Sequence, residues 1–249
     1  MNNIVTINNV TKSYNTKEGE INALKNISFI LEEGQIISLV GPSGCGKSTI
    51  LSLISDLDKD YTGTICKKKN LKVAYMLQND ALLPWLTIYE NAILGLKIHN
   101  KLNEDYLNYV DYLLEFYNLT EFKNNYPKSL SGGMKQRVAL IRTLALKPDL
   151  LLLDEPFSAL DQQSRLMISD DVYKIIKKEN KTVILVTHNI EEAITFSDYV
   201  IILSKRPAII KNILPINIKN KESIYERRKD ENFHNYFDFI WKELDSNEF

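Results

Sequence analysis

The amino-acid sequence predicts an α/β fold whose core is a mostly parallel sheet. Three short aliphatic segments, residues 36–40, 150–153 and 182–186, are apolar enough for strands that are covered on both faces. Helical patterns separate them, and strands that alternate with helices form parallel sheets. The first of these strands runs directly into a glycine-rich segment, residues 41–48, and a helical pattern then continues to residue 54.

The composition is that of a globular protein, since 44% of the 249 residues are hydrophobic and 25% are charged. The formal net charge of −1 argues against a general nucleic-acid binder. All apolar runs are far shorter than the ~20 residues of a membrane-spanning helix, and the N-terminal residues lack the pattern of an export signal. If such a protein serves a membrane, another chain must cross it.

Two strands are expected before the first central strand. Residues 4–10 alternate apolar and polar side chains, which predicts an edge strand, and residues 23–31 predict a second strand. A turn at residues 32–34 leads from the second strand into the core.

The middle of the chain reads as helical from residue 86 to about residue 119. One face of the expected helix carries Leu107, Val110, Leu114 and Tyr117. Pro127 interrupts the pattern, and a further helix begins at Ser131. Residues 86–144 therefore look like a helical insertion between two halves of the sheet. A later helical stretch, about residues 166–178, separates the second and third central strands.

The C-terminal tail, residues 216–249, is expected to be helical. Its apolar residues follow the spacing i, i+3, i+4, i+7, i+8, i+11, and they are Phe233, Tyr236, Phe237, Ile240, Trp241 and Leu244. We expect this face to pack against the body of the protein, and contact with a partner is the second reading.

The glycine-rich segment fits G-x-x-x-x-G-K-[ST], the loop that wraps nucleotide phosphates. Its glycines would let backbone N–H groups point inward, and we expect Lys47 to reach the β- and γ-phosphates of ATP and the Ser48 hydroxyl to bind Mg²⁺. A chance glycine-rich turn is improbable because the motif sits between a strand and a helix. The expected phosphate-binding residues are Gly41, Pro42, Ser43, Gly44, Cys45, Gly46, Lys47, Ser48 and Thr49.

Two adjacent carboxylates follow the second central strand. Asp154 would lie at the carboxyl edge of the sheet, where ligands of such sheets bind, and would hold the magnesium directly or through water. Glu155 is the candidate that polarises the attacking water. Acidic pairs also cap strands at protein surfaces, but four leucines before this pair and a proline after it make that reading weaker.

A second glycine-led helix start, Ser131-Gly132-Gly133, lies in the sequence LSGGMKQR at residues 130–137. A serine and two glycines that open a helix have the usual geometry of an anion site. Together with the phosphate loop and the sequence LLLLDEP at residues 150–156, this segment resembles the ATP-hydrolysing subunits of ABC transporters.

That resemblance covers roughly residues 4–213 and implies a P-loop NTPase (RecA-like) core, with an antiparallel β subdomain and an inserted α-helical subdomain. It implies one ABC ATPase domain in which residues 1–85 and 145–215 form the nucleotide-binding core. Residues 86–144 would be the helical subdomain with the signature motif, and residues 216–249 the helical tail.

The resemblance also implies roles for single residues. Tyr14 would stack on adenine, Gln78 would join the metal site to the helical insertion, and His188 would contact the γ-phosphate. Ser131, Gly132 and Gly133 would bind the γ-phosphate held by a second copy, and Asp161 would lie in the loop that crosses to that copy. Met134 and Asn189 depart from the residues most common in the family, glutamine and aspartate, without changing these roles.

Several phrases are similar to the ATPases of bacterial importers for nitrate, aliphatic sulfonates, taurine and thiamine-type precursors, among them NDALLPWLTIYENA after Gln78 and LSKRPAII at residues 203–210. The resemblance then implies a homodimer at the cytoplasmic face of the cell membrane. Its partners would be a separate permease and, indirectly, an extracytoplasmic solute-binding protein. The apolar cluster at residues 82–85 reads equally well as a permease-docking surface or as core. The alternatives are a soluble ABC ATPase in protein or cofactor assembly, a nucleotide-sensing module without hydrolysis and, more weakly, an exporter.

Overall fold

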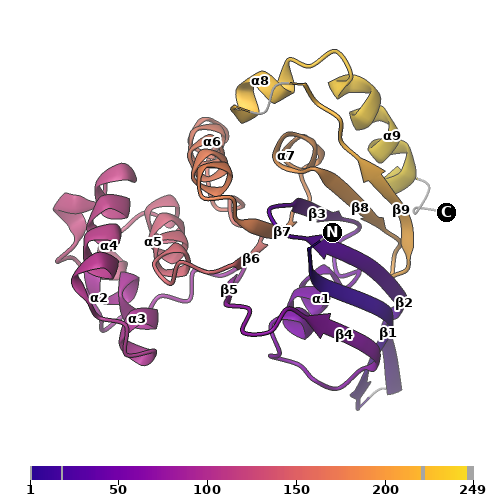
Figure 1. Ribbon diagram of the computed structural model, residues 1–249, viewed down its shortest axis with the longest axis horizontal. Coiled ribbons are helices and arrows are strands. Elements are labelled where there is room, and N and C mark those ends of the chain that lie inside the picture. The colour runs from indigo at the N-terminus through magenta and orange to yellow at the C-terminus, as the bar shows by residue number, and fades with distance from the viewer. Residues whose placement is uncertain (1, 18, 220–221, 246–249) are drawn as a thin grey trace.

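Two sheets and the helices around them form the fold seen in the computed structural model, which describes residues 2–17, 19–219 and 222–245 (Figure 1). The strands are β1 (Asn3–Thr16), β2 (Gly19–Glu32), β3 (Ile36–Val40), β4 (Thr62–Lys67), β5 (Val73–Met76), β6 (Leu150–Asp154), β7 (Thr182–Val186), β8 (Tyr199–Leu203) and β9 (Ile210–Pro215). The α-helices are α1 (Lys47–Ile54), α2 (Ile88–Ala92), α3 (Leu94–Ile98), α4 (Glu104–Phe116), α5 (Gly132–Leu144), α6 (Gln162–Lys178), α7 (Ile190–Phe196), α8 (Ile224–Arg228) and α9 (Phe233–Asp245). Two 3-10 turns, Thr120–Phe122 and Pro127–Ser129, precede α5.

The larger sheet has six strands in the order β5-β6-β7-β3-β8-β9, and only the last pairing, β8 with β9, is antiparallel. Every residue of β3, β6 and β7 is buried, because helices or the second sheet cover both faces of these strands. This confirms the α/β fold and the three central strands expected from their aliphatic sequences. The carboxyl ends of β3, β6 and β7 meet at one edge of the sheet, where polar residues follow each strand.

The smaller sheet is antiparallel, with the order β2-β1-β4. The prediction of an edge strand at residues 4–10 is wrong, since β1 is longer and pairs with β2 on one side and with β4 on the other. Alternation of apolar and polar residues reports which face of a strand is covered, and says nothing about whether its edges are paired. The missing partner, β4, has a mostly exposed and polar sequence, TGTICK, which gives little signal.

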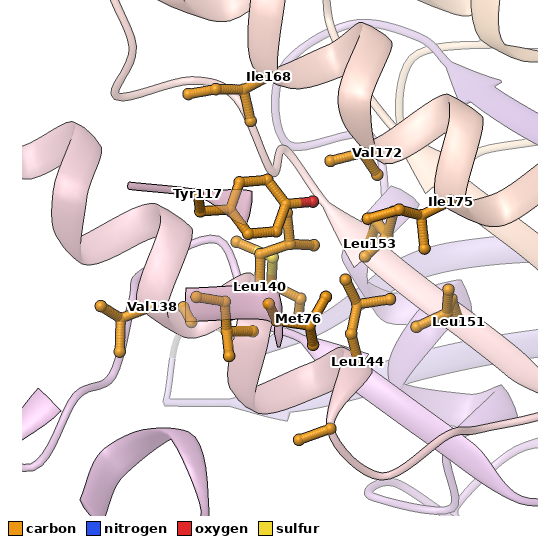
Figure 2. Close-up of a cluster of buried hydrophobic side chains, with 14 of the residues drawn as sticks. Met76, Tyr117, Val138, Leu140, Leu144, Leu151, Leu153, Ile168, Val172 and Ile175 are labelled. Atoms are coloured by element: carbon orange, nitrogen blue, oxygen red, sulfur yellow. The ribbon is translucent and has the colours of Figure 1, made fainter. Parts of the chain in front are cut away.

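Helices α2 to α5 gather on one side of the larger sheet (Figure 1). They are not a separate globule, because one hydrophobic cluster continues from them into the sheet. Figure 2 shows Leu140 and Leu144 of α5 among Leu151 and Leu153 of β6, with Val172 of α6 nearby. All five of these side chains are buried. The helical part therefore packs directly against the strand that ends at Asp154.

Helix α9 lies beside β8 and β9 of the larger sheet (Figure 1). Phe233 and Ile240 are buried in a cluster with residues of α7 and β8, and three of the other four face residues pack against that cluster. Trp241 is the exception, since it is 58% exposed. The expected packing of the tail against the body thus holds for five of the six residues.

Among the described residues, no helix combines the length and apolar composition that a membrane span requires.

Candidate functional site

A cavity of about 460 Å³ opens between the antiparallel sheet, the glycine-rich loop and the end of β6. Its lining residues are Tyr14, Ile21, Ala23, Ser43, Gly44, Gly46, Lys47, Ser48, Thr49, Gln78, Glu155 and Arg206. All of these except Ile21, Ala23 and Arg206 belong to the set that the sequence singled out. They come from segments up to 192 residues apart, counted from Tyr14 to Arg206. The fold therefore brings residues that are distant in the sequence to one cavity.

The glycine-rich loop has a shape that larger residues could not adopt. Gly46, which precedes α1, has φ of 120°, and a Cβ atom there would lie 2.8 Å from Cδ2 of Leu24. The following residue, Lys47, is only 7% exposed. Its Nζ donates hydrogen bonds to the carbonyl oxygens of Gly41 at 2.8 Å and Pro42 at 3.0 Å. The lysine charge is thus held inside the loop, at the start of a helix whose N-terminus favours anions.

The loop residues do not all face this cavity. Cys45 is 1% exposed and packs in the hydrophobic core beneath the loop. Burial raises the pKa of its thiol, and Cys66, the other cysteine, is also free. Gly41 and Pro42 line a neighbouring cavity of about 310 Å³ together with His188 and Trp241. The back of the loop therefore faces the histidine that follows β7.

Asp154 ends β6 and is 3% exposed. Burial raises the pKa of its carboxyl, which is opposed by hydrogen bonds with the Ser48 hydroxyl and with the Tyr75 hydroxyl, 3.2 Å from Oδ2. Within the described chain, no three His, Cys, Asp or Glu side chains cluster as a complete metal site. A hydroxyl and a carboxylate side by side are the oxygen donors with which Mg²⁺ is held when substrate phosphates and water supply its other ligands, so these residues fit that ion.

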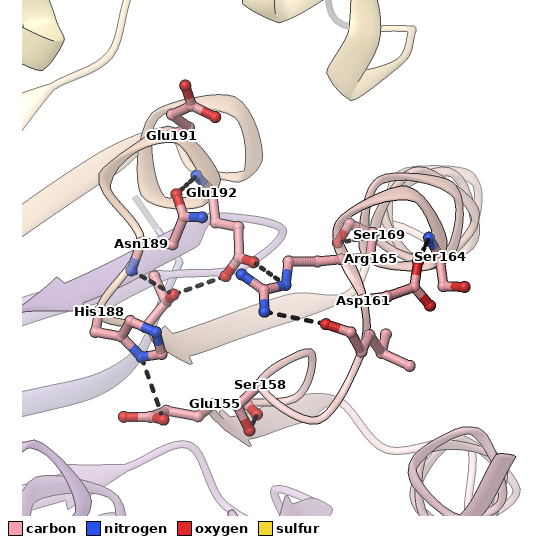
Figure 3. A network of polar contacts seen from close by, with 12 residues as sticks. Glu155, Ser158, Asp161, Ser164, Arg165, Ser169, His188, Asn189, Glu191 and Glu192 are labelled. Carbon is pink, nitrogen blue, oxygen red and sulfur yellow. Dashed lines mark hydrogen bonds and ion pairs between the residues drawn. The ribbon is translucent and has the colours of Figure 1, made fainter. Parts of the chain in front are cut away.

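Glu155 contacts two other predicted residues, His188 and Gln78. Its Oε2 lies 3.3 Å from Nδ1 of His188 and accepts a hydrogen bond from Nε2 of Gln78 at 3.2 Å. Figure 3 shows the contact with His188 across the ends of β6 and β7. The backbone of Glu155 has φ of 47°, in the left-handed region that non-glycine residues rarely adopt. Such a backbone conformation at a residue that lines a cavity is typical of functional positions.

Tyr14 lies at the outer end of the cavity on β1 and is 37% exposed. The Nζ atom of Lys12 is 4.6 Å from the centre of its ring, and its hydroxyl donates a hydrogen bond to Asp58 at 3.4 Å. The ring is therefore fixed by its neighbours but keeps an open face, as a stacking partner for a base requires.

The four residues that are expected to act on a second copy, Ser131, Gly132, Gly133 and Asp161, do not line the cavity. Ser131 caps α5, and its hydroxyl accepts a hydrogen bond from the backbone N–H of Met134 at 3.3 Å. A Cβ atom on Gly133 would lie 2.8 Å from Cδ2 of Leu160, whereas one on Gly132 would meet nothing within 4 Å. Asp161 caps α6 through Ser164. Packing within this chain explains the glycine at 133 but gives no reason for the glycine at 132.

Arg206 is a cavity residue that the sequence reasoning did not assign. Its Nε donates a hydrogen bond to the carbonyl oxygen of Gly44 at 3.1 Å, and Nη2 donates to the same atom. The residue lies between β8 and β9, 162 positions after the glycine it holds. The sequence LSKRPAII contained the residue, but no spacing rule links it to the phosphate loop.

The apolar cluster at residues 82–85 divides between its two readings. Leu82 is 9% exposed and belongs to the core that includes α5, whereas Trp85 is 69% exposed. Leu82 is thus core, and Trp85 leaves an aromatic surface close to the residues that follow Gln78.

Comparison with known proteins agrees with this geometry. A family model described as ABC transporter matches residues 24–158. The aliphatic sulfonates import ATP-binding protein SsuB of Bacillus cereus (strain ZK / E33L) is 41% identical over 236 residues, which cover 90% of this chain and 93% of that protein. The nitrate transport protein NasD of Klebsiella oxytoca is 35% identical over 244 residues, which cover 94% of this chain and 93% of that protein.

A similar solved structure is described as the dimeric structure of a post-hydrolysis state of the ATP-binding cassette MJ0796 bound to ADP and Pi. It superposes with a TM-score of 0.76 at 33% sequence identity, and the match covers 86% of this chain and 99% of that chain.

Proposed function

As a member of the ABC transporter family, this chain is an ATP-binding subunit that hydrolyses ATP, and we propose that two copies of it power the import of a small anionic solute through a separate permease. The proposal of two copies rests on one observation: within one chain, the two groups of residues expected to bind ATP do not share a cavity. Residues of the phosphate loop, Gln78 and Glu155 share one cavity, while Ser131 to Gly133 lie outside it.

The bound nucleotide would occupy the cavity with its base on Tyr14 and its phosphates in the loop that Lys47 fills. The ammonium of Lys47 would exchange its bonds to the carbonyls of Gly41 and Pro42 for phosphate oxygens. Mg²⁺ would be held by Ser48 and Asp154, with Gln78 as a further ligand, and when bound it neutralises the charge of the phosphate oxygens.

Hydrolysis needs a group that orients water and takes up its proton. Glu155 would take this role, and the support is that it lines the cavity and contacts two neighbours, Gln78 and His188. His188 would hold Glu155 and contact the γ-phosphate. A fixed carboxylate beside a fixed imidazole costs little reorganisation when the reaction occurs.

The second copy would complete each site from across the interface. In this proposal the tip of α5, with Ser131, Gly132 and Gly133, approaches the γ-phosphate in the other copy, and Asp161 lies in the loop that crosses to it. The open space at Gly132 supports this, because a residue without a side chain lets another molecule approach the backbone closely. The similarity to a dimeric cassette supports it independently.

The transported solute is proposed from the relatives, whose names refer to aliphatic sulfonates and to nitrate. The chain would then act at the cytoplasmic face of the membrane, with the exposed Trp85 near the permease contact and an extracytoplasmic binding protein selecting the solute. An aromatic side chain of this exposure suits a docking surface.

The experiment is a comparison of ATP hydrolysis and size-exclusion elution for the native protein and the Glu155→Gln variant. We expect the variant to bind ATP, to hydrolyse it at least about a hundredfold more slowly, and to elute as a dimer when ATP is present. A second substitution, Gly132→Asp, tests the dimer itself. The open space accepts a side chain, while the added charge should keep the dimer from forming. Unchanged hydrolysis by Glu155→Gln would contradict the assignment of the carboxylate.

The transport role has its own test. Co-purification with a membrane permease, and loss of sulfonate or nitrate uptake when Lys47→Ala replaces the native chain, would support import. An active ATPase that binds no permease and leaves uptake intact would favour a soluble role in assembly instead.

A further inference from the structure

A chain of polar contacts connects the loop after β6 with the end of β7 (Figure 3). Arg165, in the first turn of α6, donates a hydrogen bond from Nη2 to the carbonyl oxygen of Leu160 at 3.1 Å. Its Nε lies 3.8 Å from Oε1 of Glu192 on α7. The other carboxylate oxygen of Glu192 accepts a hydrogen bond from the Thr187 hydroxyl at 2.7 Å.

Glu192 is attached to both residues that flank His188. Its carboxylate binds the Thr187 side chain, and its backbone N–H donates to Oδ1 of Asn189 at 3.1 Å. The Thr187 hydroxyl in turn accepts a hydrogen bond from the backbone N–H of Asn189 at 3.0 Å. The backbone on either side of His188 is therefore held by one carboxylate and one hydroxyl.

These contacts are not explained by stability alone. Burial raises the pKa of Glu192, which means that its ionised form is disfavoured in this position. The Nε atom of Arg165 is buried and makes no hydrogen bond within the described residues, only the longer ion pair. The desolvation of such a pair offsets much of its attraction, so stability gives only a weak reason for having charges here.

We propose that Arg165 and Glu192 are positioning residues that transmit the placement of the loop at residues 158–161 to His188 in the same copy. The inference rests on the proposed two-copy function, in which that loop meets the other copy at the opposite ATP site. Arrival of the second copy then moves Leu160 and Arg165, Glu192 follows, and His188 is set against Glu155. Each ATP site would reach full activity only when the other site is engaged, so hydrolysis would depend cooperatively on ATP.

The test compares single and double variants of the pair in the full chain. For Arg165→Gln and for Glu192→Gln we expect kcat to fall by about tenfold to about a hundredfold, because a small displacement of His188 misplaces the reacting groups. The dissociation constant for ATP should stay within about twofold, since neither side chain lines the nucleotide cavity. The Hill coefficient for ATP should fall to about 1. The double variant should fall no further than the worse single variant, since both act through one contact.

Glu191→Gln is the matched control. It makes the same chemical change one residue earlier on α7 and removes an ion pair with Arg228 of 2.6 Å, but it touches neither Thr187 nor the loop at residues 158–161. We expect native kcat and a native Hill coefficient for it. A thermal midpoint for Glu192→Gln that is at or above the native value, together with the lower kcat, would separate positioning from a loss of folding.

Two results would overturn the inference while leaving the proposed function intact. One is native kcat and cooperativity in Glu192→Gln, and the other is an equal loss of kcat in Glu191→Gln. The two-copy function and this inference would both be overturned by two results together. The native protein would hydrolyse ATP without cooperativity, and the Glu155→Gln variant would stay monomeric in the presence of ATP.

Discussion

Nδ1 of His188 lies 3.3 Å from Oε2 of Glu155, although the two residues come from the ends of different strands, β7 and β6. The contact follows from the parallel pairing of these strands, which brings their carboxyl ends together. Glu155 also receives the amide of Gln78, so its carboxylate is fixed from two sides.

Replacement of His188 should therefore impair hydrolysis more than nucleotide binding. For His188→Ala we expect kcat to fall by about a hundredfold to about a thousandfold, because Glu155 loses one of its two anchors and the γ-phosphate would lose the contact proposed for it. The dissociation constant for ATP, measured by fluorescence of a labelled analogue, should change much less. His99→Ala, at an exposed position after α3, is the control and should keep native activity. Equal losses in the two variants would contradict this role of His188.

Arg206 gives a second prediction, on nucleotide affinity. Arg206→Ala removes the hydrogen bonds to the Gly44 carbonyl and one positive charge from the cavity. We expect ATP to bind about threefold to about tenfold more weakly, which corresponds to about 1 kcal/mol. Lys205→Ala removes the same charge one residue earlier, from a side chain that lines the neighbouring cavity, and should affect binding less. Isothermal titration with ATP measures both, and an equal effect would mean that only the overall charge matters.

The third prediction concerns stability near Tyr14. Lys12 is 3% exposed and pairs with Asp58, 3.0 Å from Oδ2, and with Asp60 at 3.2 Å. Asp58→Asn leaves the buried ammonium with a weaker partner, so we expect the free energy of unfolding to fall by about 1–2 kcal/mol. Asp60→Asn should have no measurable effect, because that side chain is 93% exposed. Urea denaturation checks both values, and a larger loss for Asp60→Asn would be contrary to this account.

Stability should also depend on pH through Glu192. Burial raises the pKa of this carboxyl above its ordinary value of 4.5, with Glu155 adding to the rise and Thr187 and Arg165 opposing it. A group whose pKa is raised on folding stabilises the fold fully below its unfolded pKa, and this contribution is lost as the pH rises through the folded pKa. Glu192→Gln cannot ionise, so it should gain stability relative to the native protein as the pH rises above 4.5. Denaturation at several pH values tests this, and a difference that shrinks with rising pH would refute it.

The sequence predicted the parts of the site that depend on strand order. Gly41 and Asp154 each follow an aliphatic segment, and parallel strands end at the same edge of a sheet, so both were expected at the edge where ligands bind. The local motif also predicted that Lys47 lies between a strand and a helix, because the strand, loop and helix are contiguous in the chain.

Other features depended on contacts that leave no local trace. The polar strand β4 has no apolar alternation, which is why the neighbouring β1 was expected at an edge. Arg206 meets Gly44 only through the turn between β8 and β9, and the Arg165–Glu192 pair joins helices that are separated by β7. The amphipathic pattern of α9 predicted burial of its face but could not predict that Trp241 stays exposed while Ile240 and Leu244 pack in the cluster.

The open space around Gly132 bears on whether a mutation at this position is dominant or recessive. An allele that puts an acidic residue there would yield a well-folded chain that still binds ATP in its own cradle. If two copies complete each other's ATP sites on a permease, as proposed, such a chain would pair with a normal copy and block the site that it should complete. In a cell that makes both kinds, the defect would be dominant, whereas an allele that only destroys the fold would be recessive.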